Sequence, residues 1–174
     1  LSQAEHDEAA QAILITPDRT FADAVAASVE AILPTLDRSA VAGASWRDHG
    51  AVITVKDWDE GVDLANDIAA EHLEIITSDP ENIAARVRHA GAIFLGPWTP
   101  EAIGDYVAGP NHVLPTARTS RFSSGLGVLD FMKRTTMVRC DADALAAIGH
   151  AAATLADAEG LQAHGLSVLR RLNR

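Results

Sequence analysis

The chain has 174 residues, the size of one ordinary globular domain, and its 48% hydrophobic and 22% charged residues are close to the averages of folded proteins. Fourteen basic and 24 acidic residues give a formal net charge of −10 with neutral histidines. This argues against general binding to nucleic acids or anionic membranes, because those contacts draw their affinity from Lys and Arg.

The first residues resemble neither a signal peptide nor the usual start of a protein. Leu1 stands where an initiator Met is expected, and residues 1–7 contain no basic or apolar region. We therefore expect a processed chain or a piece of a longer one. No apolar run approaches the roughly 20 residues that a membrane helix needs. The single cysteine, Cys140, excludes an internal disulfide and indicates a reducing, cytoplasmic compartment.

From residue 12 to residue 95, short apolar runs alternate with helical patterns. The predicted strands are Ala12–Thr16, Ala51–Val55, His72–Thr77 and Ala92–Leu95, and the predicted helices cover 18–36, 57–70 and a segment that begins at Pro80. Alternating strands and helices are typical of βα units, so we predict a Rossmann-like α/β fold with a mostly parallel sheet covered on both faces. Four strands are few for such a sheet, and we expect its remainder outside this chain.

The second half of the chain has a different composition. Residues 96–124 are rich in Gly and Pro and predict a long irregular segment that is ordered by its aromatic residues. After Cys140 the sequence predicts a helix over 144–156, capped by Asp141 or Asp143, and a last helix over 160–174 with a basic end. We therefore divide the chain into an incomplete α/β domain, 1–137, and a helical C-terminal extension, 138–174.

Two pairs of polar residues in the first domain have spacings that suit a site. Gln3 and His6 would share one face of a helix. Glu71 and His72 stand where a helix gives way to a strand, and a carboxylate beside an imidazole suits general acid–base chemistry. An exposed polar terminus and a structural histidine at a helix end explain the same spacings, and from spacing alone these interpretations are favoured.

Further polar residues are spread along the second half. Asp105 and His112 lie in a segment with flanking glycines, and a functional site and an ordinary loop explain this segment equally well. Glu159 and His164 share the final helical segment, where a solvated face is the simplest explanation. His6, Asp105 and His164 together offer donors that suit zinc. The glycine fingerprints of dinucleotide and phosphate loops are absent from the sequence.

Five strings of residues, taken together, are specific to one family. They are Ser2–His6 (SQAEH), Ala70–Glu74 (AEHLE), Gly91–Gly96 (GAIFLG), Gly104–Thr116 (GDYVAGPNHVLPT) and Gly160–His164 (GLQAH). The residues of these strings and their order along the chain closely resemble the sequence of histidinol dehydrogenase. The resemblance covers essentially the whole chain, but only the C-terminal part of the family's longer polypeptide.

The resemblance implies an activity and a set of site residues. The family oxidises L-histidinol through enzyme-bound L-histidinal to L-histidine, the last steps of histidine biosynthesis, and uses two NAD⁺ and a bound zinc. It implies zinc ligands at Gln3, His6, Asp105 and His164, an acid–base pair at Glu71 and His72, and substrate contacts at His112 and Glu159. All eight residues belong to the implied substrate-binding set.

The resemblance also implies an intertwined homodimer, in which the C-terminal segment of each chain reaches the active site of the other. The NAD site is expected mostly outside this chain, so we expect the isolated chain to be inactive. Two alternatives are a non-catalytic metal-binding module derived from the same fold and an oxidoreductase for another amino alcohol. The second is disfavoured because His112 and the full ligand set are present.

Overall fold

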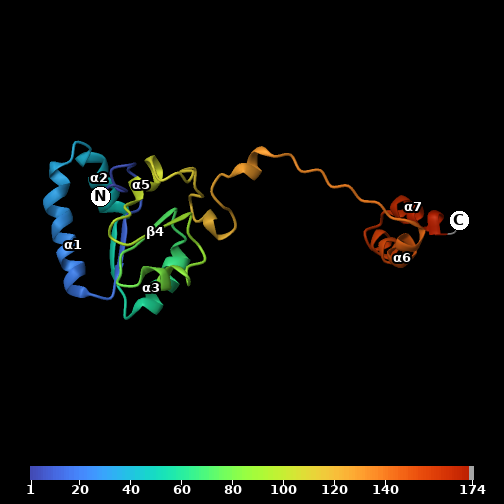
Figure 1. The fold of residues 1–174 in the computed structure, drawn as a ribbon, viewed down its shortest axis with the longest axis horizontal. Coiled ribbons are helices and arrows are strands. Elements are labelled where there is room, and N and C mark those ends of the chain that lie inside the picture. The colour runs from blue at the N-terminus through green and yellow to red at the C-terminus, as the bar shows by residue number, and fades with distance from the viewer. Residues whose placement is uncertain (173–174) are drawn as a thin grey trace. The chain divides into compact units, whose positions relative to one another are not determined.

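The computed structural model describes residues 1–172, so the last two residues of the predicted final helix lie outside the described part. It forms two compact units, Leu1–Asp130 and Phe131–Arg174 (Figure 1). The strands are β1 (Ile13–Thr16), β2 (Ala51–Thr54), β3 (His72–Ile75) and β4 (Ala92–Leu95). The helices are α1 (Arg19–Ile32), α2 (Ser39–His49), α3 (Trp58–Ile68), α4 (Pro80–Ala84), α5 (Glu101–Tyr106), α6 (Ala142–Ala158) and α7 (Gln162–Leu172), with short 3-10 turns at Leu33–Thr35, Thr119–Arg121 and Val128–Phe131.

The four strands lie where the sequence predicts them, and the α/β class is confirmed. β1 pairs with β2 and β3 pairs with β4, both in parallel, which the intervening helices make possible. In the described residues these are two separate two-stranded pairs, whereas the sequence predicted one continuous sheet. Helices α1 and α3 contact β1, and α4 contacts both strands of the second pair.

Aspartate side chains begin four of the helices. Asp18, Asp57, Asp79 and Asp141 each precede a helix, and each carboxylate accepts a hydrogen bond from the backbone N–H three residues later. Such a cap satisfies one of the N–H groups that the first turn of a helix leaves without a partner. The predicted helix starts at Asp18 and Asp57 are therefore confirmed. In the C-terminal unit, the cap is Asp141 and not Asp143, the other predicted candidate.

Two stretches differ from the prediction. The helix expected over 18–36 ends at Ile32, because Pro34 leads the chain into a 3-10 turn, and a second helix, α2, follows it. The segment over 96–124 is not wholly irregular, since it contains α5 and a 3-10 turn. At the start of α5, the backbone N–H of Glu101 donates a hydrogen bond to the carboxylate of Glu74 on β3.

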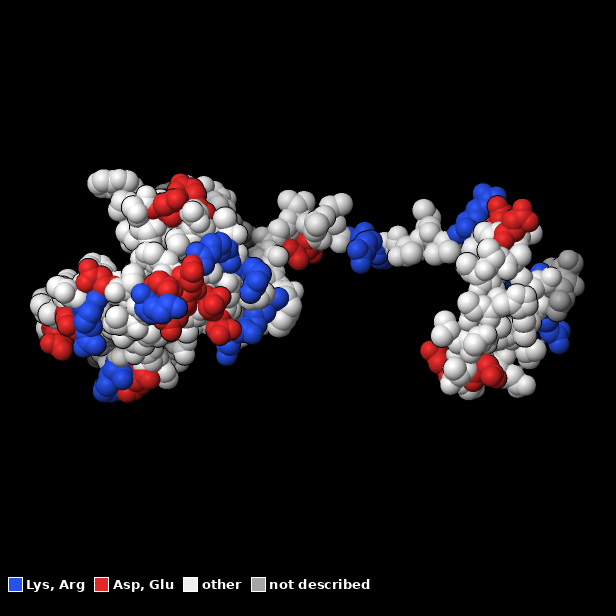
Figure 2. Space-filling view, turned by 90° about the horizontal axis from the view of Figure 1, so that it is seen from below, with Lys and Arg blue, Asp and Glu red and all other residues white. Residues whose placement is uncertain are grey.

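The buried residues of the first unit are mostly small or β-branched. Ala22, Ala42, Val55 and Val62 are among them, and Phe94 is its one buried aromatic residue among those described. In the second unit, Ala156 is buried where α6 and α7 pack together. On the face drawn in Figure 2, acidic and basic side chains are interspersed over the first unit. No helix within residues 1–172 has the length and apolar character that spanning a membrane requires.

Candidate active site

His72 begins β3 and is the centre of the candidate site. Its side chain is 14% exposed, and its ring lies 6.0 Å from the ring of Phe94 on the neighbouring strand, measured between centroids. Neither ring nitrogen has a hydrogen-bond partner among residues 1–172, although both are buried. A buried polar atom without a partner is costly, and such atoms are a mark of functional sites.

Helix α5 supplies two carboxyl groups to this imidazole. Oδ1 of Asp105 lies 3.5 Å from Nε2 of His72, at the outer limit of a hydrogen bond, and the Asp105 side chain is 19% exposed. Glu101 is four residues earlier, so the two side chains share one face of the helix. One donor atom from each of His72, Glu101 and Asp105 lies within 4.8 Å of the others. An imidazole nitrogen and two carboxylate oxygens are donors that a divalent cation such as zinc accepts, so this cluster could hold one.

Two contacts seat α5 against the second strand pair. The carboxylate of Glu74, two residues after His72 on β3, accepts a hydrogen bond of 2.7 Å from the backbone N–H of Glu101. Gly104 faces Phe94 of β4, where a Cβ atom would lie 2.3 Å from Cε1 of the ring. Because real carbon contacts are longer than this, only glycine allows the helix to come so close.

The surroundings of Glu101 shift its pKa. Burial raises the pKa of Glu101 above its ordinary value, and hydrogen bonding with Asp105 raises that pKa further. The charge of His72 opposes the rise. Glu101 therefore takes up a proton at a higher pH than a solvated glutamate does.

A cavity of ≈ 200 Å³ opens beside the cluster. Asp105 and Gly104 line it from α5, and Asn111 and Pro110 line it from the following loop. The side chain of Asn111 accepts a hydrogen bond of 2.7 Å from the N–H of Val113, which shapes the turn around His112. His112 itself is exposed in this loop.

Glu71 lies at a bend directly before β3 and is half-buried. Its carbonyl oxygen accepts a hydrogen bond of 2.8 Å from the N–H of Ala92. A Cβ atom on Gly91 would lie 2.5 Å from that same oxygen, so a glycine is required there. Glu71 is thus fixed beside His72 through its backbone.

Gln3 and His6 lie in a tight turn at the beginning of the chain. The N–H of His6 donates to the carbonyl of Gln3 at 3.3 Å, Gln3 is half-buried and His6 is exposed. The guanidinium of Arg38 donates to the carbonyl groups of Glu5 and His6 at 2.8 and 3.4 Å. The N-terminal turn is thereby attached to the connection between α1 and α2.

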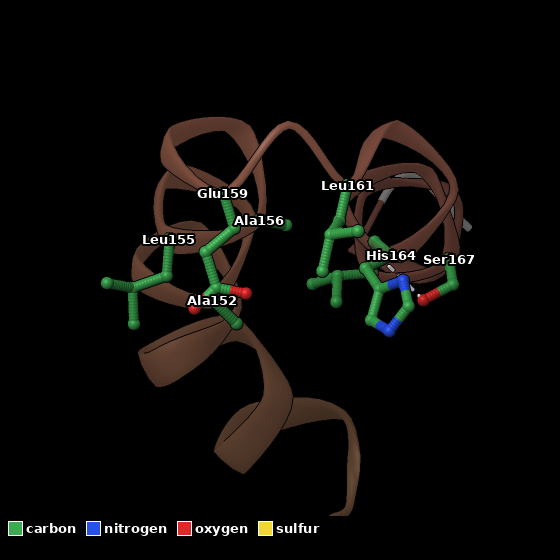
Figure 3. Close-up of a pocket in the computed structure, with 8 residues that line it drawn as sticks. Ala152, Leu155, Ala156, Glu159, Leu161, His164 and Ser167 are labelled. Carbon is green, nitrogen blue, oxygen red and sulfur yellow. Dashed lines mark hydrogen bonds between the residues drawn. The ribbon is translucent and has the colours of Figure 1, made fainter.

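In the second unit, Glu159 and His164 line one pocket of ≈ 290 Å³ between α6 and α7 (Figure 3). They do not share a helix, which corrects the prediction. Glu159 is the C-cap of α6, the chain turns at Gly160 with φ of 70°, and His164 belongs to α7. Gly165 is buried against Ala156, so the two helices pack closely and the two polar side chains line the same cavity.

Comparisons with known proteins agree on one family. The family model described as histidinol dehydrogenase matches residues 1–172. The chain belongs to the histidinol dehydrogenase family. Histidinol dehydrogenases from Ruegeria pomeroyi and Rhodospirillum rubrum are 68% and 66% identical over 174 and 175 residues, in each case covering 100% of this chain and 40% of the relative. The crystal structure of histidinol dehydrogenase from Elizabethkingia anophelis has a TM-score of 0.81 at 32% identity, covering 99% of this chain and 40% of that one.

These findings confirm the resemblance and establish its extent. The chain spans about 40% of the length of the histidinol dehydrogenases that it matches. The comparisons do not favour the alternative of a non-catalytic module derived from the same fold.

The structure brings together His72 and Asp105, which the family resemblance assigns to different roles, and adds Glu101, which sequence analysis missed. The missing signal was the spacing of Glu101 and Asp105, which is four residues and would place both on one helix face. This spacing was not recognised because Pro97, Pro100 and Gly104 are typical of loops, so no helix was predicted where α5 lies.

Proposed function

We propose that this chain is the zinc- and substrate-binding C-terminal part of a histidinol dehydrogenase. That enzyme would oxidise L-histidinol through L-histidinal to L-histidine, with two NAD⁺ as hydride acceptors. The observation that carries the proposal is the buried His72 imidazole, whose ring nitrogens have no hydrogen-bond partner within residues 1–172, beside Asp105 and a cavity in a chain of this family.

His72 is suited to remove the proton of the substrate hydroxyl. A hydride leaves the alcohol carbon for NAD⁺ only as the hydroxyl proton is taken up, and a neutral imidazole has one nitrogen free to accept it. Because neither His72 nitrogen is engaged by a described residue, the acceptor is available to a substrate. After His72 has released this proton to water, the bound aldehyde is hydrated by a water that Glu71 activates. The neutral His72 then accepts the hydroxyl proton of the hydrate as the second hydride leaves.

The ligands that we assign to zinc are Gln3, His6, Asp105 and His164. Their imidazole and carboxylate groups are of the types that zinc binds, whereas the amide of Gln3 is a less usual ligand. Of these four residues, Asp105 also lies in the cluster of converging donors with His72 and Glu101. Zinc held by these residues would supply a fixed charge that positions the substrate's imidazole and amino groups. His112 and Glu159 contact the substrate, and the NAD site lies mostly in polypeptide outside this chain.

We further propose a homodimer with exchanged C-terminal segments and a cytoplasmic location. The domain 1–137 carries the acid–base residues, and the extension 138–174 completes the site of a second copy with Glu159 and His164. The connection between the two parts supports exchange, because Phe131, Met137 and Val138 are 78%, 93% and 84% exposed and gain from being covered. The lone cysteine fits the reducing cytoplasm.

The proposal is tested by measuring NADH formation from histidinol, NAD⁺ and zinc. A polypeptide that carries this segment at the length of the relatives should form two NADH for each histidinol consumed, and histidine should accumulate. The isolated 174-residue chain should form none. Formation of a single NADH with release of the aldehyde, or no NADH at all from the longer polypeptide, would contradict the proposal.

A further inference from the structure

A carboxyl group without a role in the proposed function lies beside His72. Glu101 stands one helical turn before Asp105, and its donor atom is within 4.8 Å of those of both His72 and Asp105. Positions 101, 104 and 105 lie on one face of α5, the face that meets the second strand pair, since residues three and four apart are neighbours on a helix. Gly104 occupies the middle of this face and has no side chain, so it leaves room for the carboxyl groups on either side.

The position of Glu101 is fixed from two directions. Its backbone N–H donates to the carboxylate of Glu74 at 2.7 Å. Glu74 and His72 are two residues apart on β3 and therefore project from the same face of the strand. The helix that carries Glu101 is thus tied to the strand that carries His72. On its other side, the donor atom of Glu101 lies within 4.8 Å of that of Asp105, so the two carboxyl groups of α5 face the same space.

His72 needs a partner that its other neighbours do not supply. Both its ring nitrogens are buried without a hydrogen bond from residues 1–172, and the state of the ring is set by the bond that one of its nitrogens makes. Asp105 lies 3.5 Å away, but the proposed function commits its oxygens to zinc. Glu101 is the remaining carboxyl group of the cluster.

We propose that Glu101 is a positioning residue, whose carboxyl group orients the His72 imidazole and holds the Asp105 carboxylate beside it. This inference rests on the proposed function for its catalytic consequence, but not for its effect on the His72 ring. Groups that orient a ligand or a general base in this way are typically worth 10- to 100-fold in affinity or activity.

The test compares Glu101→Ala and Glu101→Gln in the polypeptide of the relatives' length, loaded with zinc. Per zinc-containing site, Glu101→Ala should lower kcat for histidinol about 10- to 100-fold with little change in KM. Glu101→Gln should recover part of this loss, because its amide oxygen still accepts a hydrogen bond. The ¹⁵N shifts of the His72 ring, assigned by their loss in His72→Gln, should change from one tautomer to a mixture in Glu101→Ala.

Glu81→Gln is the matched control. Glu81 also stands in the first turn of a short helix, α4, and it is exposed. This variant should keep both the wild-type kcat and the wild-type His72 shifts, and an equal fall in kcat would overturn the inference. So would Glu101 variants that melt earlier but retain kcat per site and a single His72 tautomer, since Glu101 would then be merely structural. If the wild-type polypeptide does not oxidise histidinol, the proposed function fails, and the tautomer comparison alone decides the role of Glu101.

Discussion

Replacing Gly104 by alanine tests how closely α5 must approach β4. The added Cβ would lie 2.3 Å from Cε1 and 2.9 Å from Cζ of Phe94. Carbon atoms in contact are about 3.5–4.0 Å apart, so the helix or the ring must move by about 1.2–1.7 Å. Phe94 is buried and cannot turn aside into solvent. We therefore expect α5 to move, and to change the position of Asp105 relative to His72.

The expected loss of stability is modest because two effects oppose each other. Overpacking of a buried contact costs about 1–3 kcal/mol. Alanine is better than glycine inside a helix by about 1 kcal/mol, which offsets part of that cost. The free energy of unfolding should therefore fall by about 0–2 kcal/mol, while the His72 environment changes clearly.

Urea unfolding and the ¹⁵N shifts of the His72 ring measure the two effects. Gly43→Ala is the matched control, because Gly43 also lies inside a helix, α2, and its Cβ would meet Leu33 at an ordinary 3.8 Å. That variant should be more stable than wild type by up to about 1 kcal/mol, with unchanged His72 shifts. If Gly104→Ala gains as much stability as the control and leaves the His72 shifts unchanged, the reasoning about the α5–β4 contact is refuted.

Two further predictions concern α3. The Asp57 cap accepts a hydrogen bond from the N–H of Glu60, which lowers the pKa of Asp57, so its contribution to stability is full above the ordinary Asp pKa and is lost as pH falls through the lowered value. Asp57→Asn keeps a capping side chain but removes this charge; its stability deficit in urea titrations should shrink as pH falls through that window, and a deficit independent of pH would contradict the assignment. Asn66 is 6% exposed and its side-chain oxygen accepts from the N–H groups of Arg88 and His89 at 2.6 and 3.2 Å. Asn66→Ala should cost about 1–3 kcal/mol for each buried group left without a partner, measured by thermal unfolding, and a loss below about 0.5 kcal/mol would show that water replaces the bonds.

The strands and most helix starts could be predicted because their signals are local. Runs such as Ile13–Thr16 and Ala92–Leu95 are apolar and β-prone, and the aspartate caps act within one turn of their own helix. Helix α2 was missed because its text, SAVAGASWRDH, is rich in small residues and lacks a marked apolar stripe. Its place is set by packing, as when Ser45 donates to the carbonyl of Ala10 at 2.8 Å.

The candidate site was only partly accessible from sequence because its contacts join distant segments. His72 and Asp105 are 33 positions apart, and they meet only because β3 pairs with β4 and α5 folds back on that pair. The role of Gly104 depends on the ring of Phe94, which no local pattern reveals. Glu159 and His164 illustrate the same limit, since a turn at Gly160 separates them into two helices that line one pocket. The family resemblance gave these residues roles but not their neighbours.

The central claim is that His72 transfers the proton while other residues bind the metal. It is tested most directly by measuring zinc content and NADH formation together for His72→Ala in the polypeptide of the relatives' length, with Asp105→Asn as the comparison. The account predicts that His72→Ala retains zinc near one per chain while NADH formation falls by at least about 100-fold, whereas Asp105→Asn loses both. Unchanged NADH formation in His72→Ala, or loss of its zinc together with its activity, would contradict the account.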